Sequence, residues 1–192
     1  MKEISKEALA ELPIRRYEGP VVLMDAQKIP LLKEDLERET VVGFDTETRP
    51  AFKPGESYLP SLVQLATATQ VYLFQVQQHD FSQVLGEIFS AGKLVKVGVS
   101  VDDDLKNLRK LFEFQDRSVI DLGKIAKQHG MKQTGIRNLT GILLGTRIPK
   151  GAKTTNWAAR VLTQQQITYA ATDAWACRVL FLRFKEVGLI SS

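Results

Sequence analysis

The segment VVGFDTE at residues 41 to 47 constrains the fold more strongly than any other stretch of this sequence. Its apolar residues occupy consecutive positions, and therefore both faces of an extended chain, which is typical of a strand covered on both sides. Such a strand lies inside a sheet that has helices on each face. The segment therefore predicts an α/β fold with residues 41 to 47 near the centre of the sheet.

Turn residues and changes of periodicity divide the rest of the chain into further strands and helices. The segments LVQLAT and VYLFQV flank a turn at residues 68–70 and are predicted to form a hairpin beside the central strand. The last helix is expected to begin at a T-x-x-Q capping box of Thr163 and Gln166 and to end near Gly188. The other predicted strands cover 21–25, 94–98 and 117–120, and the other predicted helices cover 26–39, 80–90, 101–113 and an interrupted region at 121–145. This order predicts a mixed sheet of five to six strands with helices on both faces.

The chain length and composition indicate one globular domain. The 192 residues are 44% hydrophobic and 25% charged, which is ordinary for a protein with a packed core. No repeat or linker divides the chain, so residues 21–192 are predicted to form a single domain. Residues 1–20 are polar and end at Gly19-Pro20, and we expect them to be a loosely attached lead-in.

The charge balance and the single cysteine restrict the environment of the protein. Lysine and arginine number 26 and aspartate and glutamate 22, and the net charge of +4 is compatible with a polyanionic partner without requiring one. Cys177 cannot form an internal disulfide, which favours a reducing, cytoplasmic location, and we expect it to be a core residue. The amino terminus lacks an apolar segment and the apolar runs are short, so neither a signal peptide nor a membrane span is predicted.

Three groups of carboxylates fall on predicted apolar faces, and these are the candidate functional residues. Alternation along the strand places Asp45 and Glu47 on one face, about 7 Å apart. Helical spacing places Asp104 on the inward, leucine-containing stripe of its helix, whereas the two aspartates before it face water. In the last helix, Asp173 follows Tyr169 by one turn on a mostly apolar face.

These buried acids need compensation, because an unpaired buried carboxylate costs several kcal/mol and like-charged neighbours increase that cost. For each acid taken alone, an ion pair with lysine or arginine is the simplest compensation. None of the three predicted faces carries a basic residue beside its acid, and His79 and His129 lie outside these segments. An all-oxygen site for Mg²⁺ or Mn²⁺ therefore fits better than a zinc site, which ordinarily has histidine or cysteine ligands.

Three short motifs in this order resemble the exonuclease motifs of the DEDD superfamily, in its tyrosine-containing branch. They are FDTET with Asp45 and Glu47, KVGVSVDDDLKNL with Asp104, and YAATDA with Tyr169 and Asp173. The segments VQLAT, VYLF and NW between them add to the resemblance, which extends over nearly the whole chain. Within this branch the sequence is most similar to the exonuclease domain of the Werner-syndrome helicase, and ribonuclease D is a more distant likeness.

The resemblance implies an RNase H-like fold and metal-dependent removal of nucleotides from a 3′ end, with release of nucleoside 5′-monophosphates. Two divalent cations, Mg²⁺ or Mn²⁺, are the implied cofactors. By the same resemblance, Asp45 would bridge the two ions, and Glu47 and Asp173 would hold the ion on the side of the attacking water. Asp104 would hold the other ion, in part through water, and Tyr169 would orient the attacking water.

The implied partner is single-stranded or 3′-recessed nucleic acid. We expect DNA rather than RNA, with a ribonuclease D-like RNA exonuclease as the alternative. Two irregular loops, at residues 50–60 and 145–156, contain the candidate phosphate contacts Lys53, Arg147, Lys150 and Lys153 and the candidate stacking residues Phe52, Tyr58 and Trp157. The competing interpretation is that the loop charges are solvated and that Trp157 packs at the start of the last helical region. Thr46 could offer its backbone to the terminal nucleotide, but its side chain faces away from the two strand acids.

Two alternative functions are compatible with parts of the sequence. Residues 44 to 48 superficially match the D-x-D-x-T nucleophile motif of haloacid-dehalogenase-type phosphatases, but Glu47 replaces an aspartate, and Asp104, Tyr169 and Asp173 stay unexplained. The glycine-rich motifs of the common nucleotide-binding folds do not occur in the required context. The alternative from another class is a non-catalytic nucleic-acid-binding scaffold of the same fold, against which the five intact motif residues argue.

Overall fold

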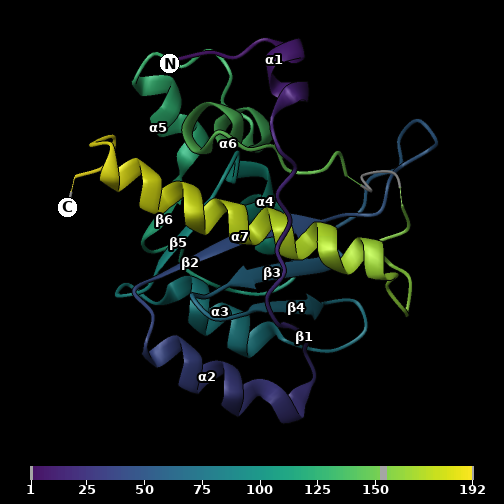
Figure 1. Cartoon of the computed structure of the whole chain (residues 1–192). Helices are drawn as coiled ribbons and strands as arrows, with labels where there is room; N and C mark the ends of the chain where they lie inside the picture. The colour runs from purple at the N-terminus through teal and green to yellow at the C-terminus, as the bar shows by residue number, and fades with distance from the viewer. Residues whose placement is uncertain (1, 152–154, 192) are drawn as a thin grey trace.

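A six-stranded mixed sheet forms the centre of the molecule (Figure 1). The strands are β1 (Val21–Leu23), β2 (Val41–Glu47), β3 (Leu62–Ala66), β4 (Val71–Gln75), β5 (Val95–Gly98) and β6 (Val119–Asp121). Their order in the sheet is β1-β4-β3-β2-β5-β6; β3 pairs antiparallel with β2 and β4, and the other neighbours pair parallel. The structure is a computed structural model, which describes residues 2–151 and 155–191. It confirms the predicted mixed sheet with residues 41 to 47 in its interior.

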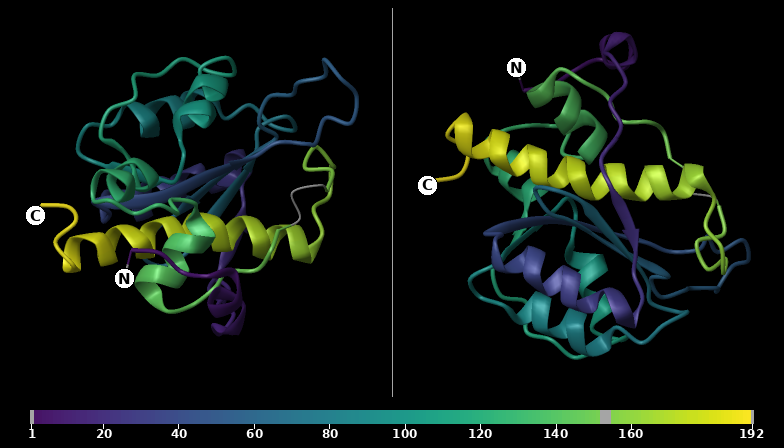
Figure 2. Two further views of the ribbon diagram at one scale, coloured as in Figure 1. Left: turned by 90° about the horizontal axis from the view of Figure 1, so that it is seen from above. Right: turned by 60° about the horizontal axis from the view of Figure 1, so that its bottom comes forward.

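Helices cover both faces of this sheet, as predicted (Figure 2). They are α1 (Lys6–Glu11), α2 (Ile29–Glu37), α3 (Ser82–Ser90), α4 (Asp102–Leu108), α5 (Leu122–Gln128), α6 (Ile136–Leu144) and α7 (Gln164–Glu186), and a 3-10 turn at Ala26–Lys28 precedes α2. Helices α2, α3 and α4 pack on one face, and α7 crosses the other face with α5 and α6 beside it. The interrupted helical region predicted at 121–145 is thus two helices. None of the helices in the described part of the chain is both long and apolar enough to cross a membrane.

The two faces of β2 show why the sheet needs helices on each side. Val42 and Phe44 point into a core formed with α2, α3 and α4. Val41 points into the core on the opposite face, which α5, α6 and α7 cover. Cys177 of α7 lies in that second core and is only 1% exposed, as predicted. The apolar residues of β2 are therefore buried on both faces of the strand.

Helix α7 lies close against β2 because residue 43 has no side chain. An ideal Cβ on Gly43 would lie 2.0 Å from the carbonyl oxygen of Ala174 and 2.7 Å from the backbone nitrogen of Arg178. The side of α7 that faces the sheet is made of small residues, including Ala170, Ala171 and Ala174, which are fully buried. This close approach holds the middle of α7 against β2 at Gly43, two residues before Asp45.

The predicted capping box begins α7. Thr163 Oγ1 accepts a hydrogen bond from the backbone nitrogen of Gln166 at 3.2 Å, and the Gln166 side-chain oxygen accepts one from the backbone nitrogen of Thr163 at 2.9 Å. The Gln166 amide nitrogen also donates to Thr155 Oγ1 and to the carbonyl of Asn156. These bonds fasten the preceding loop to the helix and confirm its predicted start.

The first 20 residues are more firmly attached than the sequence predicts. The side-chain amide of Gln133 donates to the Ile4 carbonyl at 2.9 Å and accepts from the Ile4 backbone nitrogen at 2.8 Å. Backbone hydrogen bonds also join Arg147 to Pro13 at 3.0 Å and to Arg15 at 2.9 Å. The segment therefore runs over α6 and α7 (Figure 1). The prediction of loose attachment is wrong because backbone bonds between distant segments leave no local sequence pattern.

Candidate active site

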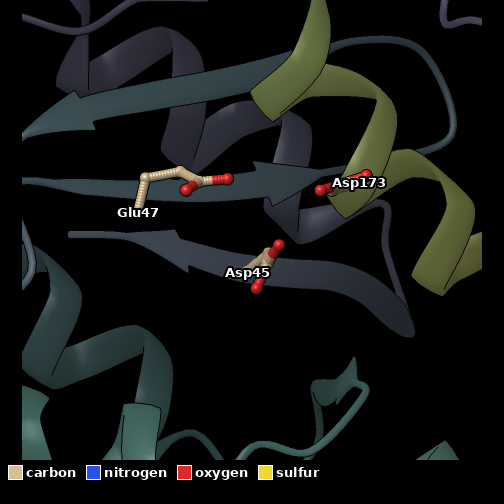
Figure 3. A group of neighbouring side chains, drawn as sticks. All are labelled: Asp45, Glu47 and Asp173. Atoms are coloured by element: carbon tan, nitrogen blue, oxygen red, sulfur yellow. The ribbon is translucent and has the colours of Figure 1, made fainter. Parts of the chain in front are cut away.

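Three carboxylates from two elements meet on the α7 side of the sheet (Figure 3). Asp45 and Glu47 lie on β2, and Asp173 lies on α7 above that strand. One carboxylate oxygen from each residue lies within 4.8 Å of the corresponding oxygens of the other two. Oxygens at this spacing can bind a divalent cation in common. The structure thus brings together three of the four acids that the sequence indicates as metal ligands.

The local structure of each element explains this convergence. Alternation along β2 turns Asp45 and Glu47 toward α7, and the absence of a side chain at Gly43 lets α7 approach the strand. Tyr169 and Asp173 lie one turn apart on the buried side of α7, where they are 9% and 4% exposed. The strand and the helix therefore present their polar residues to the same space.

Asp104 does not belong to this group of three. It lies in the first turn of α4, and its Oδ1 accepts a hydrogen bond from Thr46 Oγ1 at 2.5 Å. Thr46 lies between the two strand acids, and alternation turns its side chain away from them, as predicted. Asp104 is partly buried, whereas Asp102 and Asp103 are exposed, which also agrees with the prediction. Its charge contributes to the raised pKa of Asp45, so Asp104 influences the site electrostatically although it lies outside the group of three.

The electrostatics of the site oppose the ionisation of its acids. The pKa of Asp45 is raised well above its ordinary value, first by burial and then by repulsion from Asp173, Glu47 and Asp104. Burial also raises the pKa of Asp104 to about 6, although the hydrogen bond from Thr46 acts in the opposite direction. A proton or a divalent cation relieves such repulsion. The site is therefore suited to bind a cation.

Tyr169 is held in a fixed position as a protonated phenol. Its pKa is raised above the ordinary value by burial and then by the charges of Asp173 and Glu47. The phenol therefore stays protonated at neutral pH and can donate a hydrogen bond, but it cannot act as a base. An ideal Cβ on Gly151 would lie 1.9 Å from the Tyr169 ring, so the Gly151 backbone lies directly against it. The Trp157 ring lies beside it, with 6.0 Å between the ring centroids.

The acids open into a cleft of about 470 Å³. Strands β2 and β5 are parallel, so the residues at and just beyond their carboxyl ends, among them Glu47 and Ser100, meet at the same edge of the sheet. The other wall is formed by the first turn of α6, with Arg137 and Asn138, and by Pro149. A cleft of this size is in the range of small-ligand sites. Sequence analysis missed Arg137 and Asn138, because only the packing of α6 brings them to the acids.

Asp121 supports the turn that borders this cleft. Its Oδ1 accepts a hydrogen bond from the backbone nitrogen of Ser100 at 3.0 Å, and its Oδ2 accepts one from that of Val101 at 3.2 Å. The Oδ1 atom also caps α5 by accepting from the backbone nitrogen of Gly123 at 2.8 Å. Ser100 has a φ of 61°, so these bonds hold a backbone conformation that serine rarely adopts.

A buried amide lies beside the acids. Gln64 is paired with Asp45 across β2 and β3, so their side chains are on the same face of the sheet. The Gln64 side chain is fully buried, and neither of its amide atoms has a hydrogen-bond partner among the described residues. A buried polar group without a partner costs about 1–3 kcal/mol. Exceptions of this kind to the rules of folding are most often found at functional sites.

The loop after β2 contains two of the predicted nucleic-acid contacts in exposed positions. Phe52 is 80% exposed, and Lys53 is exposed beside it. Tyr58 is partly buried beneath the guanidinium of Arg49, whose Cζ lies 3.6 Å from the ring centroid. Phe52, Tyr58 and Arg49 border a hollow of about 330 Å³. The ring of Phe52 is therefore accessible to a base, whereas one face of Tyr58 is already covered.

The candidate contacts of the second loop, at residues 145–156, differ in their exposure. Lys150 is exposed, and Arg147 is partly buried with its Nε donating to the Leu12 carbonyl at 2.9 Å. Lys153 lies outside the described residues. Trp157 is only 1% exposed, so the prediction that it stacks on a base is wrong and the competing interpretation is right. A tryptophan at the end of a loop is compatible with either role, and only its packing in the core distinguishes them.

Comparisons with known proteins show the family of this chain. A family described as 3′-5′ exonuclease matches residues 21–188. The mouse bifunctional 3′-5′ exonuclease/ATP-dependent helicase WRN is 28% identical over 198 residues, which cover 96% of this chain and 14% of the mouse protein. A 3′-5′ exonuclease of Arabidopsis thaliana is 30% identical over 203 residues, which cover 96% of this chain and 70% of the plant protein. The chain spans less than half the length of the mouse protein and of two further curated relatives, namely 14%, 40% and 26%.

Solved structures share the fold of this chain. The EXO domain of Aedes aegypti Nibbler matches with a TM-score of 0.79 and 22% identity, over 90% of this chain and 91% of that domain. Trypanosoma brucei RNase D in complex with RNA U12 matches with a TM-score of 0.77 and 18% identity, over 88% of this chain and 63% of that one. These structures agree with the RNase H-like fold that the motifs imply. The matched family, the fold and the acids gathered in one cleft together show that the chain belongs to the 3′-5′ exonucleases, of the DEDD type.

Proposed function

We propose that this chain hydrolyses the phosphodiester bond at the 3′ end of a nucleic-acid strand by a two-metal mechanism and releases nucleoside 5′-monophosphates. The observation that carries the proposal is the group of Asp45, Glu47 and Asp173, whose carboxylate oxygens lie within 4.8 Å of one another in a cleft. When bound there, divalent cations supply an acidified water for the attack and charge stabilisation for the leaving 3′ oxygen.

The residues present fit Mg²⁺ or Mn²⁺ better than zinc. The three converging side chains offer only oxygen, the donor that these ions prefer. The two histidines are occupied elsewhere, because His129 contacts the Leu189 carbonyl at 3.1 Å and the ring of His79 packs near Phe81. The raised pKa of Asp45 also supports cation binding, because a cation would screen the repulsion between the acids.

The four acids would divide the binding of the ions between them. Asp45, on which the charges of the other three acids act, would contact both ions, and Glu47 and Asp173 would hold the ion beside the attacking water. Asp104 would act on the second ion, in part through water. Its partial burial, its raised pKa and its influence on Asp45 support this role.

Tyr169 positions the water that attacks the phosphorus. Its phenol is protonated and hydrogen-bonds to Asp173, so the hydroxyl lies where it would reach a water oxygen or the substrate phosphate once a cation takes the Asp173 carboxylate. The packing of Gly151 and Trp157 against its ring restricts its movement. A fixed donor of this kind orients a nucleophile without taking its proton.

The substrate is single-stranded or 3′-recessed nucleic acid, and we propose DNA as the first candidate. The likeness to the mouse exonuclease/helicase WRN covers nearly the whole chain and is compatible with DNA. The fold likeness to an RNase D that was solved with RNA U12 favours RNA as the alternative. Competition between DNA and RNA strands of the same sequence distinguishes the two candidates.

The experiment follows shortening of 5′-labelled strands from the 3′ end, with Mg²⁺ or Mn²⁺ and with chelator. We expect a ladder of shortened products that requires the metal and disappears in Asp45→Asn. Asp103→Asn is the matched control, because Asp103 is an exposed acid next to the site. If the folded wild-type protein binds the strands and shortens none of them, the non-catalytic scaffold is the correct alternative.

A further inference from the structure

A second hollow, of about 540 Å³, lies next to the catalytic cleft. We call it the basic groove, because four cationic residues line it, namely Lys6, Arg137, Arg147 and Lys150, and none of the described residues that line it is acidic. Lys6 belongs to α1, so the first 20 residues of the chain form one wall. The opposite wall is formed by α6 and the segment that follows it.

The basic groove adjoins the catalytic cleft. Arg137, Asn138 and Pro149 line both of them, so the two hollows share a wall. A strand whose 3′ end lies at the acids therefore needs to pass only these shared residues to reach the groove. The positive charge of the groove lies next to the negative charge of the site, which suits a polyanion that is cleaved only at its end.

The cations of the groove are free to bind a ligand. Within residues 2–151 and 155–191, none of the four forms an ion pair with a carboxylate, although salt bridges are frequent elsewhere on the surface. Lys6 and Lys150 are exposed. The side chains of Arg137 and Arg147 are positioned by the carbonyls of Ile148 and Leu12. Two of the cations are thus positioned by hydrogen bonds, and the other two are exposed to solvent.

The groove also has an apolar part. Leu9, Ala10, Ile14 and Pro149 line it, and Ile14 is 45% exposed. Apolar side chains beside cations suit a single strand, whose bases pack on apolar groups while its phosphates contact the cations. A duplex would instead present its phosphates alone.

We propose that the basic groove binds the nucleotides that lie on the 5′ side of the 3′-terminal nucleotide in a single strand, through their phosphates and bases. This inference rests on the proposed exonuclease function. It assigns a binding role to residues 6–14, which precede the segment that matches the exonuclease family. The wall that they form is held against α6 at Gly141, where an ideal Cβ would lie 2.5 Å from the Leu9 side chain.

The test compares a dinucleotide with a strand of about twelve nucleotides of the same 3′ sequence. The dinucleotide has a single phosphodiester, which occupies the catalytic cleft, whereas the longer strand also reaches the groove. The test variant is the double substitution Lys6→Gln and Lys150→Gln. The matched control is Lys93→Gln with Lys127→Gln, which removes two exposed lysines outside the groove and changes the net charge equally.

We expect the ratio of kcat/KM for the long strand to that for the dinucleotide to fall about tenfold in the test variant and to stay at the wild-type value in the control. Binding of the long strand in chelator, measured by fluorescence anisotropy, should show a salt dependence whose slope is smaller by about 0.7 for each lost phosphate contact. A third variant, Gly141→Leu, displaces Leu9 and should lower the same ratio. Circular dichroism checks that each variant is folded.

The outcomes separate the groove from the proposed function. If the wild-type protein cleaves both strands and the test variant keeps the wild-type ratio and salt slope, the groove proposal is wrong and the exonuclease function stands. If the wild-type protein neither cleaves nor binds any strand, both proposals are wrong. If the kcat/KM ratio falls as much in the control variant as in the test variant, the effect comes from net charge, and the groove proposal is also wrong.

Discussion

Asp45 is the residue at which the stability and the chemistry of the site are most directly opposed. Burial and the charges of Asp173, Glu47 and Asp104 raise its pKa, so its ionised form costs free energy in the folded protein. The same repulsion gives the site its affinity for a cation, because binding relieves it. The acids are therefore expected to weaken the metal-free fold, and removal of one charge should reveal this.

We expect Asp173→Asn to lower kcat by at least about a thousandfold, because several kcal/mol of metal-assisted stabilisation is lost. The melting temperature of the metal-free variant should equal or exceed that of the wild type, since asparagine keeps the volume of the side chain and removes a buried charge. Thermal denaturation in chelator and a single-turnover assay measure the two effects. Asp103→Asn, at an exposed position, is the control. A fall of more than about 4 °C in the melting temperature would show that Asp173 has a structural role.

The crossing of α7 over β2 is the contact between elements on which the site depends. An ideal Cβ on Gly43 would overlap the backbone of α7 at Ala174 and Arg178. Backbone atoms cannot rotate away as a side chain can, so a larger residue must move the helix. Asp173 lies immediately before Ala174, and any such shift also moves its carboxylate relative to β2. The position of one glycine thus determines the spacing of the acids.

We expect Gly43→Ala to cost about 1–3 kcal/mol of unfolding free energy, the usual cost of overpacking a core. For a chain of this length that corresponds to a fall of about 2–12 °C in melting temperature. Mg²⁺-dependent cleavage should fall as well, because the helix moves away from the strand acids. The control is Gly92→Ala, since an ideal Cβ on Gly92 has nothing within 4 Å. Equal melting temperatures for the two variants would contradict the tight crossing.

Across the whole molecule, charge is separated into an acidic cleft and an adjoining basic groove. The two hollows share Arg137, Asn138 and Pro149, although the residues that make them come from both ends of the chain. The net charge of +4 does not reveal this separation. The buried acids of the cleft also affect the whole protein, because they change how its stability depends on pH.

We expect the metal-free protein to lose stability as the pH rises from about 5 to 7.5. Asp45 and Asp104 have raised pKa values in the folded state, about 6 for Asp104, so they bind their protons more tightly when folded. Stability therefore falls as the pH rises from the ordinary pKa near ~4 to the folded-state pKa. Acids with a lowered pKa, such as Asp116 beside Arg109, act in the opposite direction only below that ordinary value.

Thermal denaturation in chelator at several pH values measures this effect. Addition of Mg²⁺ at pH 7.5 should raise the melting temperature, and Asp45→Asn should reduce the dependence on pH. A metal-free melting temperature that rises steadily between pH 5 and 7.5 would show that the acids are compensated by other groups.

The sequence alone determined the features that depend on residues a few positions apart. Alternation in residues 41–47 placed Asp45 and Glu47 on one face and Thr46 on the other, and helical spacing placed Tyr169 and Asp173 together. The capping box at Thr163 marked the start of α7 in the same way. These features follow from the period of a strand or a helix, which the order of neighbouring residues encodes directly.

Only the tertiary structure decided which distant segments meet. It attaches the first 20 residues to α6 and to the segment before it, buries Trp157 beside Tyr169, and brings Arg137 to the wall of the cleft. It also leaves Asp104 outside the group of the other three acids and hydrogen-bonded to Thr46. Such contacts depend on how whole elements pack, and the free energy of packing is distributed over many interlocking side chains. No local pattern in the sequence therefore predicts which distant segments pack together.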